Sequence, residues 1–235
     1  MNHIHTFEKS EFPDYEKCTG CGSYHSTALL PPDEVYVNVP YWGDGTGRST
    51  LEQQFSNHNC VDDCGISKVD RVMQFVPKGD VVIEAACAPA ALLKKLIEFG
   101  YKEVIGIEPA LRYVDFICHQ APGAKIVHGY FPDVLHPELK DYADCFVALD
   151  LAEHIEDYDT FFKAIHRVLK PGGTGIIMSP IILEDGLLRK RDMEHPGEHA
   201  WIWTEAFIKP YLQEIFSEVK LNRWLVGHEI IRLKK

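Results

Sequence analysis

Three acidic residues stand where apolar runs end, and carboxylates at such positions can hold a polar ligand. Glu84 closes "DVVIE", Glu108 closes "EVIGIE" and Asp150 closes "DCFVALD". In a parallel sheet the carboxyl ends of the strands meet at one edge, and ligands bind there. An acidic residue after the second strand can accept hydrogen bonds from both hydroxyls of a ribose. Together the three residues predict a nucleotide-type cofactor site, although each alone is also compatible with a solvated strand end.

Two histidine-containing segments offer groups that can accept a proton from a substrate. His154 lies in "AEHIED" shortly after Asp150, and His199 lies in "MEHPGEHAWIWT", with Glu198 beside it and His195 nearby. Histidine titrates near neutral pH, which suits a general base. The alternative for each of these histidines is a surface or packing role.

Four of the seven cysteines form two closely spaced pairs near the beginning of the chain: Cys18, Cys21, Cys60 and Cys64. Two thiolate pairs on separate turns are the usual way to complete a tetrahedral zinc site, and four thiolates leave no open position for catalysis. The spacing therefore predicts a structural zinc. Two alternatives stay open: His25 or His58 replaces one cysteine, or the four thiols are unrelated. The other cysteines fall in apolar patterns and are expected to be buried: Cys87, Cys118 and Cys145.

Predicted strands and helices alternate from about residue 68 onward, whereas residues 1–67 have weak periodicity and many turn residues. This division predicts two parts, an N-terminal cap over 1–67 with the cysteine pairs and a larger domain over 68–235. Alternation with continuous apolar strands predicts an α/β fold, in which helices cover both faces of a parallel sheet. At the end of the chain, "SEVKLNRW" and "GHEIIRLKK" predict an antiparallel hairpin that completes the sheet. The expected strands are 80–84, 103–108, 124–128, 144–150 and 174–180, and the expected helices are 89–99, 110–120, 158–170 and 204–216.

Composition and charge narrow the function classes. The formal net charge of −11 opposes nucleic-acid binding, because phosphates need a basic surface. No apolar run approaches the roughly 20 residues that a membrane span requires, and "MNHIHTFEKSEF" lacks the apolar stretch of a signal peptide. We therefore expect a cytoplasmic protein that acts on a small molecule.

Four segments resemble the class I S-adenosylmethionine-dependent methyltransferases: "VVIEAACAPA", "VIGIEPA", "ADCFVALDLAEHIED" and "FKAIHRVLKPGGTGIIMSP". The resemblance covers about residues 68 to 235. It implies a Rossmann-like seven-stranded sheet, mostly parallel with one antiparallel strand, and S-adenosylmethionine as the cofactor. It also implies that Glu84 faces the methionine end of the cofactor, Glu108 the ribose and Tyr130 the adenine. The full set of cofactor-binding residues that it implies is Glu84, Ala86, Ala88, Ala90, Glu108, Pro109, Tyr130, Phe131, Asp150 and Leu151.

The first cofactor loop differs from the family pattern at three positions, because Ala86, Ala88 and Ala90 stand where the family has glycine. Glycine permits positive φ and a close approach of the ligand to the backbone. An alanine in the left-handed region costs on the order of 1 kcal/mol. Three hypotheses follow: a natural variant that still binds its cofactor, a natural descendant that binds it weakly or not at all, or a deliberately inactivated variant. The alternative function is a non-catalytic binding protein with the methyltransferase fold.

A narrower resemblance concerns sugar and natural-product methyltransferases that carry a four-cysteine zinc module before the catalytic domain. "CTGCGS" and "CVDDCGI" are similar to the two halves of that module, and "EHAWIWTEAF" is similar to a segment in which a Glu-His pair acts as the base. This resemblance implies that Glu198 and His199 form the catalytic pair. It also implies a sugar or nucleotide-sugar as the acceptor of the methyl group.

Overall fold

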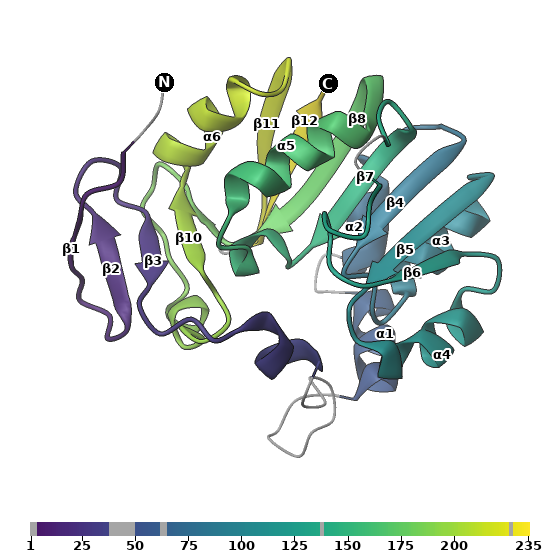
Figure 1. The fold of residues 1–235 in the computed structure, drawn as a ribbon, viewed down its shortest axis with the longest axis horizontal. Helices are drawn as coiled ribbons and strands as arrows, with labels where there is room; N and C mark the ends of the chain where they lie inside the picture. Colours follow the sequence, from purple (N-terminus) through teal and green to yellow (C-terminus); the bar gives the residue numbers. More distant parts are fainter. Residues whose placement is uncertain (1–3, 38–49, 62–64, 137–138, 226–227) are drawn as a thin grey trace.

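The computed structural model describes residues 4–37, 50–61, 65–136, 139–225 and 228–235. A central sheet of seven strands lies beside a smaller sheet of five strands (Figure 1). The central sheet contains β4 (Val81–Ala85), β5 (Glu103–Glu108), β6 (Lys125–His128), β7 (Ala143–Leu149), β8 (Leu169–Ser179), β11 (Glu218–Leu225) and β12 (His228–Lys234).

The central sheet has the order β11-β12-β8-β7-β4-β5-β6. Neighbouring strands from β8 to β6 are parallel, whereas β12 pairs antiparallel with both β8 and β11. One strand of the seven therefore runs against the others. The predicted fold class and the antiparallel hairpin at the end of the chain are confirmed.

Helices cover both faces of this sheet because successive strand residues point to opposite sides. Val82 packs with α2 (Lys68–Met73), α3 (Ala91–Phe99) and α4 (Leu111–Gln120) on one face. Ile83 packs with α5 (Tyr158–Val168) and α6 (Glu205–Gln213) on the other face. Both faces are buried, which explains why the strands read as continuous apolar runs.

Two details of the elements differ from expectation. The helix before "KPGG" ends at Val168, and β8 already begins at Leu169, so the Pro-Gly-Gly sequence lies within the strand. The residue before proline disfavours helical dihedrals, which agrees with an extended Lys170. Cys118 was expected to be buried but is exposed, because it is one position past the buried Ile117 and turns away from the sheet.

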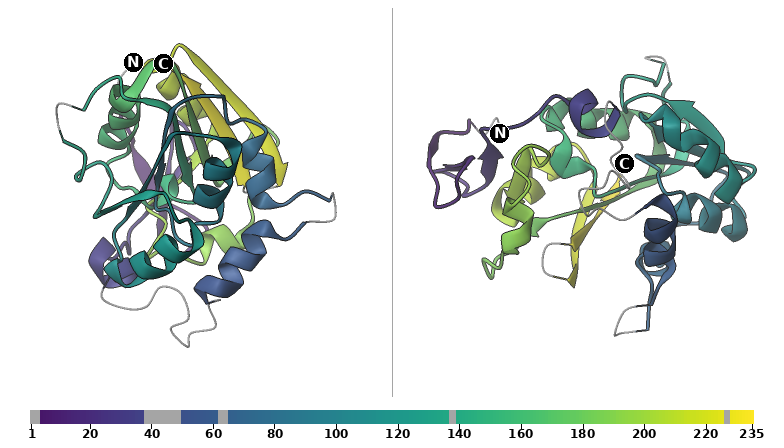
Figure 2. Two further views of the ribbon diagram at one scale, coloured as in Figure 1. Left: turned by 90° about the vertical axis from the view of Figure 1, so that its right-hand side faces the viewer. Right: turned by 90° about the horizontal axis from the view of Figure 1, so that it is seen from below.

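The smaller sheet joins the beginning of the chain to a late segment. Its order is β1 (Phe7–Lys9), β2 (Tyr15–Cys18), β3 (Tyr24–Ser26), β10 (Trp201–Thr204) and β9 (Ile181–Ile182). The helix α1 (Leu51–Asn59) instead packs beside α2 and α3, and the views in Figures 1 and 2 place it well away from β1–β3. Within the described residues no helix is long and apolar enough to cross a membrane.

Candidate functional site

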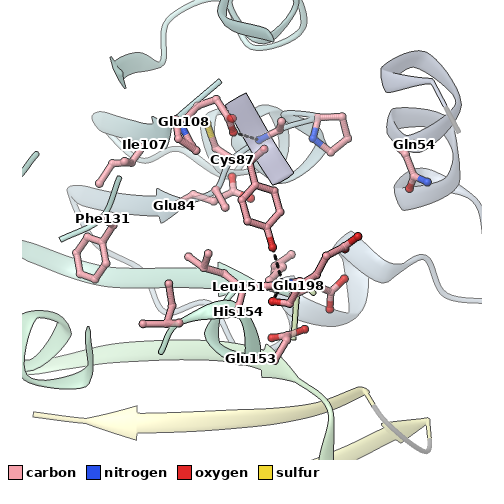
Figure 3. Close-up of a pocket in the computed structure, with 18 of the residues that line it drawn as sticks. Gln54, Glu84, Cys87, Ile107, Glu108, Phe131, Leu151, Glu153, His154 and Glu198 are labelled. Atoms are coloured by element: carbon pink, nitrogen blue, oxygen red, sulfur yellow. Dashed lines mark hydrogen bonds between the residues drawn. The ribbon is translucent and has the colours of Figure 1, made fainter. Parts of the chain in front are cut away.

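A cavity of about 680 Å³ opens at the carboxyl ends of the central strands. The loops after β4, β5, β6 and β7 form one side of it. The remaining wall comes from α1, α2, a short π-helix (Asp33–Val37) and the segment that precedes β10. Figure 3 shows Glu84 and Glu108 on one side of the cavity and Glu153, His154 and Glu198 on the opposite side.

Glu108 ends β5 and holds the cofactor loop in place. Its Oε2 accepts a hydrogen bond from the Ala88 N–H at 3.2 Å, and its Oε1 accepts one from the Ala110 N–H at 2.9 Å. Burial raises the pKa of this carboxyl to about 7, against the effect of the two backbone donors. Each carboxylate oxygen retains a further lone pair, so Glu108 can also accept hydrogen bonds from a ligand in the cavity.

Glu84 ends in a buried carboxylate whose Oε2 has no hydrogen-bond partner among the residues that the structure describes. Burial, with the nearby Glu108, raises its pKa well above the ordinary value, and Lys68 opposes that rise. A buried acceptor without a partner is costly, so this oxygen favours a ligand that brings a donor. The ammonium group of an amino acid is such a donor, and the residues present therefore fit the methionine end of S-adenosylmethionine.

The third strand-end carboxylate, Asp150, pairs with a lysine. Lys68 Nζ lies 2.5 Å from Asp150 Oδ2, and both residues line the cavity. The same region contains His58 of α1, whose pKa burial lowers to about 3, with a further contribution from Lys68. His58, which was considered as a metal ligand, therefore contributes to the wall of the cavity.

The alanine loop adopts the backbone conformation that glycine favours at two of its three alanines. The φ angle is +54° at Ala86 and +73° at Ala90, whereas Ala88 has no left-handed backbone. Ala86 and Ala88 line the cavity, and Ala90 is fully buried at the start of α3. Close packing beneath the loop depends on Gly106, where an added Cβ would lie 2.7 Å from the Cys87 sulfur.

The residues expected near the adenine and at the end of β7 also line the cavity: Pro109, Tyr130, Phe131 and Leu151. The Tyr130 hydroxyl donates a hydrogen bond to Asp33 Oδ1 at 2.7 Å, which ties the cavity to the π-helix. Phe131 packs against Phe146 of β7, with ring centroids 4.7 Å apart. Of the ten predicted cofactor-binding residues, Ala90 is the one that does not line the cavity.

His154 and His199 face each other across a short distance, with ring centroids 4.8 Å apart. His154 Nδ1 lies 2.9 Å from the Glu198 carbonyl oxygen, and His199 Nδ1 lies 2.8 Å from the Asp192 carbonyl oxygen. A carbonyl can only accept, so each Nδ1 carries the proton and each Nε2 is left as an acceptor. Both rings are therefore set up to receive a proton at Nε2.

The two histidines differ in their electrostatic surroundings. Burial lowers the pKa of His154 to about 3, and the neighbouring His199 lowers it further. Burial also lowers the pKa of His199, but the Asp192 carbonyl and the carboxylates of Asp192 and Glu198 oppose the shift. Acidic neighbours favour the charged imidazolium, so His199 is the better proton acceptor of the pair.

Several residues of the cavity could not be recognised from the sequence. Tyr36 reaches in from the π-helix, and its hydroxyl lies 2.6 Å from His154 Nδ1. Glu153 is buried, accepts a hydrogen bond from the Ser179 hydroxyl at 2.9 Å, and has its pKa raised to about 8 by burial and by Asp150. Its ligand atoms and those of His154 and His199 lie within 4.8 Å of one another, a spacing that a metal ion can also use. The one feature of the sequence that could have identified Glu153 as a cavity residue is its position directly before His154.

The predicted zinc ligands are not all brought together. Cys18 and Cys21 lie side by side in the smaller sheet, and the described residue that joins them is His5. Cys60 is exposed at the end of α1, in another part of the molecule (Figure 1), and Cys64 lies outside the described residues. His25 contacts Glu16 and Trp201 rather than the cysteines. Close spacing in the sequence predicted the first pair correctly but says nothing about how two distant pairs are arranged.

Comparisons with known proteins agree with this fold. Residues 83–177 match the sequence model of a family described as a methyltransferase domain. The chain is 26% identical over 161 residues to the mitochondrial ubiquinone biosynthesis O-methyltransferase of Rattus norvegicus, a match that covers 60% of this chain and 43% of that protein. The chain thus spans less than half the length of this curated relative.

Solved structures share the fold at low sequence identity. A chain from the complex between the Haloferax volcanii Trm112 methyltransferase activator and a putative methyltransferase has a TM-score of 0.63 at 14% identity, covering 78% of this chain and 92% of that chain. A putative O-methyltransferase from Nostoc punctiforme has a TM-score of 0.60 at 12% identity, covering 72% and 56%. The sheet order is that of the Rossmann-like methyltransferase fold, and residues 83–177 within it match a methyltransferase domain.

Proposed function

We propose that this protein transfers a methyl group from S-adenosylmethionine to a hydroxyl oxygen of a small molecule. The observation that carries the proposal is that one cavity is lined by Glu84 and Glu108 on one side and by His154 on the opposite side, with His199 beside His154 (Figure 3). One side fits the cofactor, and the other fits an acceptor that must lose a proton.

The cofactor side uses the residues at the ends of β4, β5 and β7. Glu84 would hold the amino group, Glu108 the ribose hydroxyls, and the wall formed by Tyr130 and Phe131 the adenine. When bound, S-adenosylmethionine supplies a methyl group carried on a sulfonium. The protein has to orient the acceptor against that group and exclude water.

The acceptor side uses His199 as the general base. Its Nδ1–H is held by the Asp192 carbonyl, so its Nε2 can take the proton from the acceptor hydroxyl. Asp192 is held in turn by Arg189, with Nη2 2.7 Å from Oδ1. His154, whose Nδ1–H is shared between the Glu198 carbonyl and the Tyr36 hydroxyl, stays neutral and positions the acceptor.

A hydroxyl is the favoured acceptor because the base is a neutral imidazole, which can remove a proton from oxygen more readily than from carbon. The curated relative from rat is named an O-methyltransferase, whereas one structural neighbour is named a geranyl diphosphate C-methyltransferase. Sugars and nucleotide-sugars are the hydroxyl compounds that we propose to test first, with phenols as a second class.

Cofactor binding is the first test. Calorimetry and thermal unfolding are measured with S-adenosylmethionine and with S-adenosylhomocysteine. A ligand at 100 times its Kd stabilises the folded state by about 2.7 kcal/mol, so we expect Tm to rise by roughly 5–10 °C. No change in Tm at millimolar ligand contradicts the proposal.

The second test identifies the acceptor. Formation of S-adenosylhomocysteine is measured with a panel of sugars, nucleotide-sugars and phenols. His199→Asn should lower this turnover by about 100-fold or more while the variant still binds S-adenosylhomocysteine.

A second candidate function is a non-catalytic binding protein with the methyltransferase fold. Two observations favour it: the methyl groups of Ala86 and Ala88 line the cavity, and two loop alanines are held at positive φ. A neighbour of the same fold, with a TM-score of 0.55 and 12% identity, is named a [4+2]-cyclase, so this fold also serves other activities. If Ala86→Gly with Ala88→Gly binds the cofactor and the natural sequence does not, this second function is the correct one.

A further inference from the structure

We propose that His5, Cys18 and Cys21 bind one zinc ion, which joins the N-terminal strands to the segment that forms the acceptor side of the cavity. The ligand atoms of these three residues lie within 4.8 Å of one another. Two thiolates and an imidazole are a donor set that zinc prefers. The ligand set differs from the four cysteines that the sequence predicted, and the proposal does not depend on methyl transfer.

The turn between β2 and β3 brings the two cysteines to one side. Cys18 N–H donates to the Ser23 carbonyl and Gly22 N–H donates to the Cys18 carbonyl, each at 2.8 Å. Gly22 has a φ of +75°, which a residue with a side chain rarely adopts. This closed turn places the Cys18 and Cys21 side chains next to each other without a second segment of chain.

His5 reaches the turn through the pairing of β1 with β2. Phe7 is opposite Cys18 in the antiparallel register, and the Thr19 N–H donates to the Thr6 carbonyl at 2.8 Å. His5, two residues before Phe7, therefore lies beside the turn. Its Nδ1 is 3.7 Å from Cys21 Sγ. In a tetrahedral zinc site, a thiolate and an imidazole nitrogen are about 3.6 Å apart, given the usual metal–ligand lengths.

The surroundings of the three ligands also match those of a metal site. The other ring nitrogen of His5, Nε2, lies 3.4 Å from the Tyr158 hydroxyl, and metal-bound histidines usually have such a second partner. The Ser23 hydroxyl lies 3.4 Å from Cys21 Sγ and accepts a hydrogen bond from the Thr204 N–H at 3.0 Å. The His5 ring packs against Trp201 and Phe207, which fix its position, and Cys18 is buried.

These contacts connect the cluster to the cavity. Thr204, which hydrogen bonds to the carbonyl of Cys21 at 2.7 Å, ends β10, and β10 directly follows the segment with Glu198 and His199. β3 pairs with β10 through His25 and Trp201. A bound zinc therefore holds the strand that anchors the acceptor side.

The test measures metal in the purified full-length chain, without cofactor or acceptor. We expect about one zinc per chain in protein grown with zinc and purified without chelator. His5→Ala, Cys18→Ser and Cys21→Ser should each retain less than about a third of it. Cys60→Ser and Cys118→Ser are the matched controls, since both cysteines are exposed and outside the cluster, and both variants should keep the full amount.

A second measurement covers variants that fold poorly. Replacement of zinc by Co²⁺ in the natural chain should give the thiolate-to-cobalt absorption of a tetrahedral site, and His5→Ala should alter that absorption while both thiols remain. Chelation should lower Tm by roughly 5 °C or more and make two further thiols reactive. Less than half an equivalent of zinc in fresh protein overturns the proposal, and so does a disulfide between Cys18 and Cys21. Zinc that is lost from His154→Gln but kept in Cys21→Ser also overturns it, because the ion would then be in the cavity.

Discussion

The two sides of the cavity are built in different ways. The cofactor side consists of residues at or just after the carboxyl ends of β4, β5, β6 and β7, so one parallel sheet places all of them. The acceptor side combines Tyr36, His154 and His199, which come from three separate segments. The geometry of the cofactor side should tolerate single substitutions, because one rigid sheet positions it. The geometry of the acceptor side depends on each contact between its three segments. The following variants separate the two sides.

The largest effect is expected from His199→Asn on the acceptor side. Removal of a general base typically lowers turnover by about 100-fold or more, while affinity for S-adenosylhomocysteine should change by less than about twofold. Steady-state kinetics and calorimetry measure the two quantities. His166→Asn on α5 is the control and should match the natural chain in both. A parallel loss of cofactor affinity in His199→Asn would show that the two sides are not independent.

Glu108→Ala should have the next largest effect, and it should act on the cofactor side. In the proposed site the two ribose hydroxyls donate hydrogen bonds to the Glu108 carboxylate. Loss of these two hydrogen bonds costs roughly 3 kcal/mol, which lowers the affinity for S-adenosylhomocysteine by about 100-fold. Glu103→Ala is a matched control, because Glu103 begins the same strand and pairs with Lys125 at the surface. Calorimetry measures the affinity of both variants for S-adenosylhomocysteine. Equal affinities would show that Glu108 does not bind the cofactor.

A smaller effect is expected in the pH dependence of stability. The pKa of Glu153 is raised to about 8, so between its ordinary value and pH 8 the folded state holds a proton that the unfolded state has released. Stability should therefore fall as pH rises, by roughly 1–2 kcal/mol from pH 6.5 to 8. Urea unfolding should show that Glu153→Gln reduces this fall by about that amount, because the amide does not titrate and can still accept from Ser179. Glu108 and Glu84, whose pKa values are also raised, add a fall of the same sign that the variant should keep.

Histidine does not produce this fall. His154 has a lowered pKa of about 3, so its contribution to stability is lost only as pH drops below the ordinary histidine value. Glu156→Gln serves as the control in the same segment, since Glu156 is exposed. If the control flattens the pH profile as much as Glu153→Gln does, the buried carboxyl is not the cause.

The smallest effect concerns the loop of the cofactor side. Ala86→Gly and Ala90→Gly should each raise the free energy of unfolding by about 1 kcal/mol, because glycine adopts positive φ without a steric penalty. Ala88→Gly should lower it by about 0.5–1 kcal/mol, because Ala88 has no left-handed backbone and glycine adds entropy to the unfolded chain. Urea unfolding of the three variants tests the sign, and stabilisation by Ala88→Gly would contradict the explanation.

The sequence by itself determined the sheet and which strand-end residues line one side of the cavity. Apolar runs that end in Glu84, Glu108 and Asp150 predict parallel strands, and parallel strands bring their ends to one edge whatever the loops do. Nine of the ten predicted cofactor-binding residues line the cavity for this reason. His154 and His199 were also predicted as candidate bases from their residue type, and both line the cavity; their catalytic role stays a prediction.

The tertiary structure alone decided which distant segments meet. The contact of Tyr36 with His154 and the grouping of His5 with Cys18 and Cys21 depend on packing between segments far apart in the chain. The spacing of cysteines defines a local turn but not its neighbour, so Cys60 was expected beside Cys18 and Cys21 and lies elsewhere. Periodicity records which face of an element is buried. It carries no information about which partner covers that face, since many apolar surfaces can bury one another equally well.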